Sequence, residues 1–300
     1  MELRELDYFL TIIRCGSLSE ASRELHLSQP ALTRSLKHLE EELGKQLIIR
    51  GSRRIQLTQD GQLFRRRAEE ILQLTENARK EMQSSDQILE GDIYVCAGET
   101  KALHFLTQAY QKLRTQHPGI RLHISSGDAR DVQSGLKDGL IDFGVMYPPF
   151  DEQVISSIRI PFEDEWGLIM RKDHPLASKA VISSKDLVRL PLIVSRELYD
   201  THRTARLLSI PEEELSIVAT YSLSFNGTLM VTDGIGCLLG LNHIINLTED
   251  TVNCFRPLSP SVTQNIHVCW KRYAPMSRPA AALLETMRNM DVGEQNYWLK

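Results

Sequence analysis

The chain has 300 residues, of which 42% are hydrophobic and 25% charged, and its formal net charge is -4. This length suits about two domains, and the composition excludes both a single small domain and extended disorder. No apolar run approaches the ~20 residues that cross a bilayer, and the first residues form no signal peptide, so we expect a cytoplasmic protein with no membrane partner.

The first 44 residues contain three predicted helices. Apolar residues at helical spacing indicate a first helix up to Gly16. Ser17 and Glu20 fit a capping box that begins a short second helix. Ser28 is a further cap, and Pro30 suits the first turn of a third helix, whose apolar face ends at Leu43. A short helix, a tight turn and a new helix predict a helix-turn-helix.

After the third helix the apolar period becomes alternating, which predicts a short basic hairpin over residues 47–58. Between Lys45 and Arg67 there are seven bases and one acid, a local charge of +6. Three helices and a hairpin make a winged helix-turn-helix. Its third helix fits the ~12 Å major groove while the wing lies along phosphates, so double-stranded DNA is the expected partner.

The residues predicted to contact DNA are Ser28, Gln29, Pro30, Thr33, Arg34 and Lys37 on the third helix, with Arg50, Arg53 and Arg54 on the hairpin. Arg34 is the expected base reader, because a guanidinium bonds O6 and N7 of guanine together. For each of these residues, contact with the DNA backbone alone is the open alternative.

A long helix is predicted from a cap at Thr58 to about Leu89. Spacings of 4 and 3 along it define a heptad seam, made by Phe64, Ala68, Ile71, Thr75, Ala78, Met82, Ser85 and Leu89. We expect a homodimer through this seam, chiefly at Phe64, Ala68, Ile71, Ala78 and Met82. The alternative is a helix that packs on its own domain.

From Gly91 onward, apolar runs alternate with helical or turn-rich segments, which predicts an α/β fold with mostly parallel strands. The expected strands lie at residues 93–96, 120–124, 141–146, 166–170, 192–194, 217–220 and 266–270, and a helix is expected over 103–116. Ligands of such sheets bind at the carboxyl ends of the strands. The glycine-rich run 234–240 is predicted to be a turn that leads into a helix.

Together, several segments resemble the bacterial family of LysR-type transcriptional regulators. The DNA-binding part of the resemblance rests on Gly16-Ser17-Leu18-Ser19-Glu20-Ala21-Ser22, Leu25 through Arg34, Leu39 through Gly44, and Leu57-Thr58-Gln59-Asp60-Gly61. The remainder rests on Gly91-Asp92-Ile93, Asp142 through Val145, His174 through Ala177, and Val231 through Leu239. The resemblance covers nearly the whole chain.

The resemblance implies a winged helix-turn-helix over residues 1–58, a linker and dimerisation helix over 59–90, and a periplasmic-binding-protein-like effector domain over 91–300. The effector domain would have one subdomain at 92–162 and 266–300 and another at 163–265, joined by crossovers near 162–165 and 261–265. It also implies a homotetramer, a pseudo-palindromic operator and RNA polymerase as a further candidate partner.

A small-molecule effector is expected between the two subdomains. The candidate residues follow the predicted strands or begin a helix: Thr100, Lys101, Ser126, Tyr147, Ser195, Arg196 and Asn226. Hydroxyls, an amide and helix amino termini suit a carboxylate, with Lys101 and Arg196 supplying positive charge. Glu99 argues the other way and leaves an amino acid-like effector open, and Ser126 and Ser195 could merely cap helices.

No pattern predicts an enzyme, a cofactor or a metal site. Ser134 and Lys137 match a Ser-x-x-Lys pattern but lack its companion motifs, and the nine histidines show no metal-binding spacing. The five scattered cysteines predict free thiols. A ligand-responsive transcription factor therefore explains every segment, whereas an enzyme with a DNA-binding domain or an exported solute-binding protein does not.

Overall fold

The computed structural model describes residues 1–50, 55–83 and 89–290. The chain forms two compact units, Met1–Asp86 and Gln87–Lys300. Within the described ranges, no helix is long and apolar enough to span a membrane. The five cysteines are free thiols, four of them buried, as predicted.

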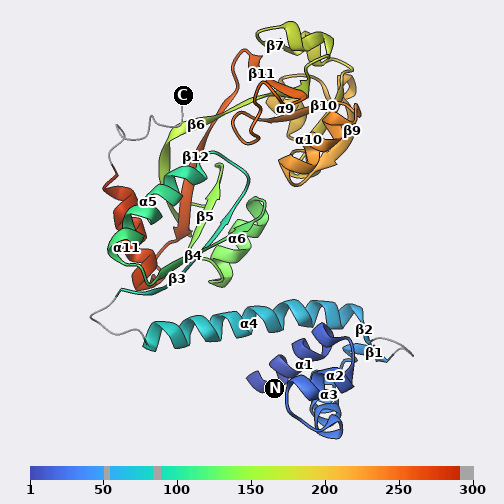
Figure 1. The fold of residues 1–300 in the computed structure, drawn as a ribbon, viewed down its shortest axis with the longest axis vertical. Helices are drawn as coiled ribbons and strands as arrows, with labels where there is room; N and C mark the ends of the chain where they lie inside the picture. Colours follow the sequence, from blue (N-terminus) through green and yellow to red (C-terminus); the bar gives the residue numbers. More distant parts are fainter. Residues whose placement is uncertain (51–54, 84–88, 291–300) are drawn as a thin grey trace. The chain divides into compact units, whose positions relative to one another are not determined.

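The first unit contains three short helices, a hairpin and one long helix (Figure 1). These are α1 (Leu3–Cys15), α2 (Leu18–Glu24), α3 (Gln29–Leu43), β1 (Ile48–Arg50), β2 (Ile55–Leu57) and α4 (Gln59–Gln83). The predicted caps are present: the hydroxyl of Ser17 accepts the N–H of Glu20 at 3.2 Å, and that of Ser28 accepts the N–H of Ala31 at 3.4 Å. The predicted winged helix-turn-helix is therefore confirmed.

Apolar side chains from all three helices form the core of this unit. The buried set is Phe9, Ile12, Ala21, Leu32, Leu36, Leu39, Leu47 and Ile48. Leu43, predicted on the same face of α3, is instead 36% exposed, because α3 ends there at a left-handed glycine, Gly44.

The long helix α4 begins after Thr58, whose hydroxyl accepts the N–H of Gly61 at 2.9 Å. Its first turns pack on α1: the ring of Phe64 meets that of Phe9 edge to face at 5.2 Å, and Ala68 is fully buried. This part of the helix therefore packs on its own domain. The helix is described to Gln83, and its predicted continuation over residues 84–88 falls outside the described residues. Leu89, predicted as the last seam residue, is not helical and instead packs against a hydrophobic core of the second unit.

The second unit is built on a curled sheet with the strand order β4-β3-β5-β12-β6-β10-β8-β9, and β11 pairs with β6 and β7. Its strands are β3 (Gly91–Ala97), β4 (Ile120–Ser126), β5 (Phe143–Met146), β6 (Ile155–Arg171), β7 (Ile182–Ser183), β8 (Pro191–Ser195), β9 (Ser216–Tyr221), β10 (Cys237–Leu241), β11 (Asn253–Ser259) and β12 (Thr263–Lys271).

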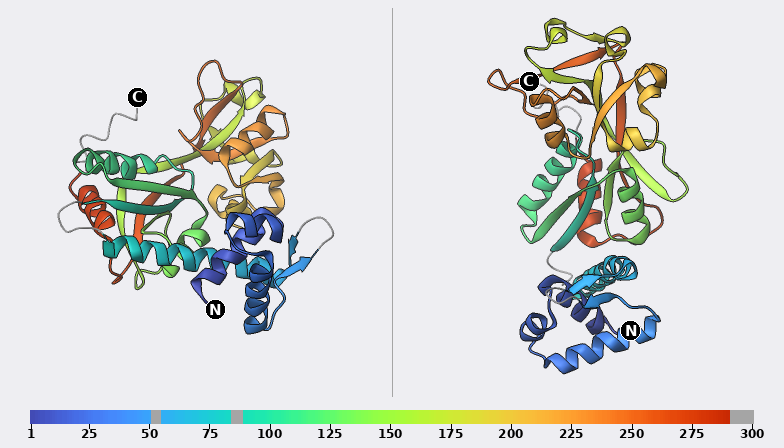
Figure 2. Two further views of the ribbon diagram at one scale, coloured as in Figure 1. Left: turned by 60° about the horizontal axis from the view of Figure 1, so that its bottom comes forward. Right: turned by 90° about the vertical axis from the view of Figure 1, so that its right-hand side faces the viewer.

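Strand β6 belongs to both halves of this unit. Up to Glu165 it pairs with β12, and from Trp166 it pairs with β10 and β11 (Figures 1 and 2). The change of partner falls within the crossover region that the family resemblance implies. We refer below to the half containing β3, β4 and β5 as the first subdomain and to the half containing β8, β9 and β10 as the second.

Helices cover the sheet in each subdomain. They are α5 (Leu103–Gln116), α6 (Ala129–Asp138) and α11 (Arg278–Arg288) in the first, and α7 (Ser184–Leu187), α8 (Arg196–Asp200), α9 (Thr204–Leu208) and α10 (Ser224–Thr232) in the second, with 3-10 turns at Pro175–Ser178 and Glu212–Glu214. Separate buried clusters around Phe143 and around Leu192 give each subdomain its own core.

The pairing of the strands agrees with the mostly parallel arrangement that was expected, and one other expectation needs correction. Strands β3, β4 and β5 are parallel, as are β8, β9 and β10, but β6 and β12 run antiparallel to their neighbours. They do so because the chain crosses from one subdomain to the other and back. The glycine-rich run 234–240 is not a turn into a helix: Gly234 follows helix α10, and strand β10 begins at Cys237.

Candidate functional site

Helix α3 presents most of the predicted DNA-contacting side chains at the surface of the first unit. Ser28, Gln29, Pro30, Arg34 and Lys37 are exposed, whereas Thr33 is half-buried. In the turn before α3, His26 adopts a left-handed backbone conformation with φ of 54°. Residues on one side of α3 are thus available while Leu32 and Leu36 on the opposite side are buried.

Some polar groups of α3 are already engaged within the unit. The Ser19 hydroxyl donates to the Gln29 side-chain oxygen at 3.3 Å, which links α2 to α3. The Thr33 hydroxyl donates to the backbone oxygen of Gln29 at 2.9 Å, and the ammonium of Lys37 pairs with Glu41 at 3.3 Å. Arg34 is exposed and has no ion pair within the described ranges.

The basic stretch seen in the sequence is partly neutralised in the structure. Lys45 pairs with Asp60 at 3.5 Å, Arg65 with Glu69 at 2.9 Å, and Arg67 with Glu70. Because exposed ion pairs are weak, these bases can still exchange their partners for phosphates. Arg50 lies at the end of β1, and Arg53 and Arg54 fall outside the described residues.

The residues predicted for dimerisation divide into two groups along α4. Phe64 contacts the core of its own unit and Ala68 is buried, so neither offers a large surface to a partner. Farther along, Ile71 is half-buried, while Ala78 and Met82 are exposed, Met82 at 83%. Leu74, one helical turn before Ala78, is 39% exposed and was not part of the predicted seam.

A cavity of about 90 Å³ lies between the two subdomains of the second unit, at the carboxyl ends of β3 and β5. Its walls are formed by Gly98, Glu99, Thr100, Gly127, Asp128, Ala129, Val145, Met146, Tyr147, Pro148, Pro149 and Ile266 from the first subdomain and its crossover strand, and by Glu197 and Arg203 from the second. We call this space the cleft cavity.

A buried carboxyl group stands behind one wall of the cleft cavity. Asp164, on the crossover strand β6, has no exposed surface. Its Oδ2 accepts hydrogen bonds from the hydroxyls of Thr100 at 2.5 Å and Tyr147 at 2.6 Å, while its Oδ1 has no partner in the described part of the chain. Burial raises the pKa of Asp164 above its ordinary value of 3.8, and burial likewise raises the pKa of Tyr147.

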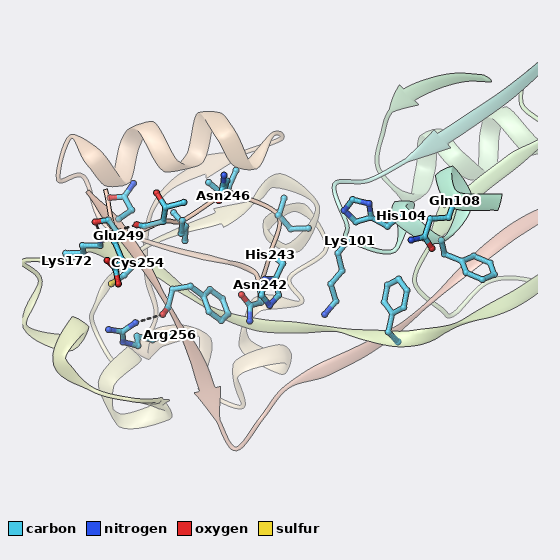
Figure 3. Close-up of a pocket in the computed structure, with 18 of the residues that line it drawn as sticks. Lys101, His104, Gln108, Lys172, Asn242, His243, Asn246, Glu249, Cys254 and Arg256 are labelled. Carbon is cyan, nitrogen blue, oxygen red and sulfur yellow. Dashed lines mark hydrogen bonds between the residues drawn. The ribbon is translucent and has the colours of Figure 1, made fainter. Parts of the chain in front are cut away.

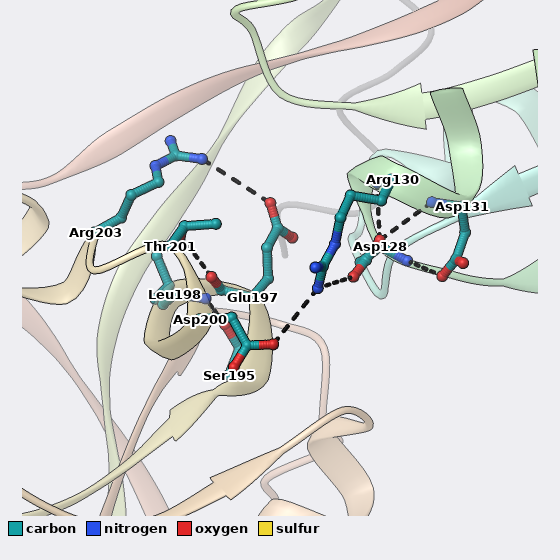
Figure 4. A network of polar contacts seen from close by, with 9 residues as sticks. All are labelled: Asp128, Arg130, Asp131, Ser195, Glu197, Leu198, Asp200, Thr201 and Arg203. Atoms are coloured by element: carbon teal, nitrogen blue, oxygen red, sulfur yellow. Dashed lines mark hydrogen bonds and ion pairs between the residues drawn. The ribbon is translucent and has the colours of Figure 1, made fainter. Parts of the chain in front are cut away.

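Two polar contacts join the subdomains beside the cavity. The Glu99 carboxylate accepts the backbone N–H of Ser224, the first residue of α10. Arg130 lies 3.2 Å from Asp128, the N-cap residue of its own helix, and 3.5 Å from Asp200 on α8 (Figure 4). The contacts of Glu99 and Arg130 depend on how far the subdomains are closed.

Asp128 and Glu197 line the cavity from opposite subdomains, and the Arg130 side chain lies between them (Figure 4). Two backbone N–H groups hold the carboxylate of Asp128, which caps α6, and they lower its pKa against the opposing effect of burial. Burial, followed by the charge of Asp128, raises the pKa of Glu197. The guanidinium of Arg203 is 3.9 Å from Glu197, a long contact (Figure 4).

Of the predicted effector residues, the structure brings only Thr100 and Tyr147 together in the cleft cavity. Ser195 accepts the N–H of Leu198 at 3.2 Å and so caps α8, the alternative role foreseen for it. The others outside its wall are Lys101, Ser126, Arg196 and Asn226, the last three with exposed side chains. Sequence reasoning missed Asp128, Asp164, Glu197 and Arg203; only Asp128 carried a local signal, a capping box with Asp131.

A second, wider hollow of about 1180 Å³ also has walls from both subdomains (Figure 3). Lys101, His104 and Gln108 lie on one wall, and Asn242 through Glu249 with Cys254 and Arg256 lie on the other. The cationic side chains of the second wall form hydrogen bonds with backbone carbonyl groups. Lys172 donates to the carbonyl of Thr248 at 3.1 Å, and Arg256 donates to that of Ala177. The ammonium of Lys101 lies 5.9 Å from the ring centre of Phe162.

Comparison with known families identifies both units. Residues 3–62 match the bacterial regulatory helix-turn-helix protein, lysR family, and residues 86–291 match the LysR substrate binding domain. The HTH-type transcriptional regulator YtlI of Bacillus subtilis (strain 168) is 29% identical over 84% of this chain and 92% of its own. The regulator AlsR of the same organism is 28% identical over 67% of each chain.

Solved structures show the same fold. CbnR, a LysR family transcriptional regulator, superposes with a TM-score of 0.75 at 18% identity, over 96% of this chain and 98% of that one. Full-length CbnR complexed with its target DNA gives a TM-score of 0.73 at 20% identity, over 96% and 99% of the two chains. The relatives YtlI and AlsR are named as transcriptional regulators and not as enzymes. This chain, with its winged helix-turn-helix and its substrate-binding domain, belongs to the LysR family of DNA-binding transcriptional regulators.

Proposed function

We propose that a small-molecule effector bound in the cleft cavity controls the DNA binding of this regulator. The observation that carries the proposal is the make-up of the cavity wall, to which one subdomain gives Thr100 and Tyr147 and the other gives Glu197 and Arg203. A ligand that touches both subdomains binds one degree of closure better than another. Such a differential affinity is what shifts a conformational equilibrium.

The proposed DNA contacts are made by α3 and the hairpin. The proposal assigns base reading to Arg34, because its guanidinium is exposed and has no ion pair in the described ranges. Lys37 and Gln29 would contact bases or backbone at the rim of the same face, with Ser28, Pro30 and Thr33 near the helix start. Arg50, Arg53 and Arg54 would contact phosphates, in keeping with their place on a basic wing.

The proposed assembly is a homodimer that binds a pseudo-palindromic operator, since two-fold pairing of the reading heads matches two-fold symmetry in DNA. The exposed apolar side chains of α4, Leu74, Ala78 and Met82, support a second copy of α4 as the partner. The effector units offer a further apolar surface at Val218, Phe225 and Leu229, which are 48%, 61% and 50% exposed and support assembly into a tetramer.

A metabolite screen by thermal shift on the full chain tests the effector proposal, because a ligand that binds only the folded state raises its stability. Each compound that raises Tm is then tested on Gly98→Leu. Gly98 lines the cavity, and a Cβ there would meet only the Gly127 carbonyl oxygen, at 3.7 Å, so the larger side chain enters the cavity without a clash at its base.

We expect Gly98→Leu to abolish the shift and Gln111→Leu, an exposed position on α5, to retain it. The same compound should change operator affinity in a gel-shift assay of the parent protein but not of Gly98→Leu. The proposal fails if no compound in the screen gives a shift that is lost in Gly98→Leu.

A further inference from the structure

The amino terminus of α10 is already occupied by a negative charge from the chain itself. Its N-cap position is Leu223, which has no side chain able to accept a hydrogen bond. Glu99, from the other subdomain, supplies the missing acceptor by taking the N–H of Ser224 on its Oε2. A helix amino terminus attracts anions. Here the Glu99 carboxylate already occupies that position, so its negative charge would repel the carboxylate of an effector.

The rest of the cleft cavity is also acidic. Besides Glu99, its wall contains the carboxylates of Asp128 and Glu197, against the one guanidinium of Arg203. Arg203 contacts Glu197 only at 3.9 Å. Arg130, at the rim, is shared between Asp128 and Asp200 and therefore neutralises neither fully. The described wall residues thus include three carboxylates and a single cation, which gives the cavity wall a net negative charge.

A second, independent observation points the same way. Asp164 is wholly buried behind Thr100 and Tyr147, and its Oδ1 is an acceptor without a donor in the described ranges. A buried acceptor left unpaired is costly. Lys101 lines the wider hollow and lies over Phe162, and its charge opposes, without overcoming, the effect of burial on the pKa of Asp164. A positive group in the cavity, beyond the hydroxyls of Thr100 and Tyr147, would add to the attraction that Lys101 already exerts on the Asp164 carboxylate.

From this arrangement we infer that the effector is a small organic cation, an amine or a guanidinium compound, whose positive group lies among Glu99, Asp128 and Glu197. The inference rests on the proposed function, because it names the chemical class of ligand for the same cavity. A volume of about 90 Å³ is well below the ~300 Å³ of sites for drug-sized ligands, which favours a short, unbranched compound. Glu99 acts here as a specificity-determining residue that rejects anions.

Four compounds with a common four-carbon chain separate charge from size: 1,4-diaminobutane and agmatine as cations, 4-aminobutanoate as a zwitterion and butanedioate as a dianion. Calorimetric titration of the full-length protein should give measurable binding for the cations and at least tenfold weaker binding for butanedioate. Binding of butanedioate equal to or stronger than that of both cations would overturn the inference.

Charge-neutral variants locate the effect. Glu99→Gln keeps an oxygen that accepts the Ser224 N–H but removes the charge, so cation affinity should fall about tenfold, as it should in Glu197→Gln. Glu213→Gln, at an exposed position of a 3-10 turn, is the matched control and should leave affinity unchanged. Equal affinity in Glu99→Gln and Glu213→Gln would also overturn the inference.

The outcomes separate this inference from the effector proposal itself. Binding of butanedioate at least as strong as that of both cations, and abolished by Gly98→Leu, would contradict a cationic effector and leave the effector cavity supported. Cation binding that survives in Gly98→Leu would contradict both. If none of the four compounds binds, the cationic class is overturned, and the cavity is then judged by the metabolite screen alone.

Discussion

The carboxylate of Glu99 caps helix α10 across the cleft, by accepting the N–H of Ser224. The acceptor comes from one subdomain and the helix from the other, so the hydrogen bond exists only while the cleft is closed to this degree. Loss of a helix cap costs about 0.5–2 kcal/mol. Closure of the cleft is thus linked directly to the stability of α10.

Glu99→Ala should therefore expose the amide of Ser224 to solvent. We expect hydrogen exchange at Ser224 to accelerate about tenfold, while exchange in β8 stays unchanged. Glu213→Ala serves as the control, because Glu213 is exposed and far from Glu99 in the sequence. Unchanged exchange at Ser224 in Glu99→Ala would show that the cap does not hold the cleft.

Arg34→Ala should relax sequence choice, because a bidentate arginine–guanine contact is worth about 1–3 kcal/mol of discrimination. Binding-site selection on random duplexes measures the effect, which should appear as a lost guanine preference in each half-site. Arg53→Ala should instead weaken binding to all sequences alike and flatten its salt dependence. An unchanged selected operator for Arg34→Ala would contradict the base-reading role.

Gly61→Ala should destabilise the DNA-binding unit. A Cβ at this position would lie 1.9 Å from the carbonyl oxygen of Leu47, a backbone atom that cannot move freely. Overpacking of this kind costs about 3 kcal/mol. Urea denaturation followed by circular dichroism should detect the loss, whereas Gln62→Ala, exposed on the same helix, should be near neutral. Equal stabilities would mean that α4 shifts away from Leu47 without cost.

Met82→Asp should dissociate the proposed dimer without unfolding the chain, because Met82 is 83% exposed in the single chain and an interface would bury the new carboxylate. Sedimentation velocity should report a smaller particle, and the circular dichroism spectrum at 25 °C should remain that of the folded parent protein. Phe64→Asp should instead destabilise the DNA-binding unit and lower its Tm, since Phe64 packs on Phe9 within the same chain. A parent-sized particle for Met82→Asp would exclude this part of α4 from the interface.

Asp164 should give an unusual dependence of stability on pH. Its pKa in the folded protein is raised by burial above the ordinary 3.8, so the folded state binds the proton more tightly than the unfolded state. Protonation of Asp164 therefore increases the free energy of unfolding as the pH falls through the folded-state pKa towards 4. Measured against Asp164→Asn, the wild type should become relatively more stable between pH 7 and pH 4.

Asp186 serves as a control, because its contribution to stability should depend on pH in the opposite direction. Contacts with Lys179 and Ser183 lower its pKa to about 2. The wild-type advantage over Asp186→Asn should be present above pH 4 and should disappear as pH falls towards 2. A pH-independent difference for Asp164→Asn, with the expected trend for Asp186→Asn, would contradict the buried charge at Asp164.

Local signals allowed much of the fold to be predicted. The caps at Ser17, Ser28 and Thr58 fixed the starts of three helices, and the expected helix 103–116 coincides with α5. The first half of β6 and strand β10 could not be found in this way. Residues 155–165 carry polar side chains because they cross between subdomains, and β10 follows a glycine-rich turn.

The cleft cavity was less predictable, because its residues come from distant segments. Thr100 and Tyr147 were found because each follows a predicted strand. Ser195 and Arg196 were predicted as effector contacts, but Glu197 was not. The neighbouring sequence does not indicate which of these side chains faces the opposite subdomain. Asp164 lies within a strand, where an acid is unexpected and only the hydroxyls of Thr100 and Tyr147 explain its burial.

The continuous strand β6 also limits how the two subdomains can move. It pairs with β12 from Ile155 to Glu165 and then enters the second sheet without a break. A hydrogen-bonded two-stranded ribbon resists stretching but tolerates additional twist. The subdomains can therefore rotate relative to one another about this ribbon. Their separation at the ribbon then stays nearly constant, and the residues farthest from it move the most.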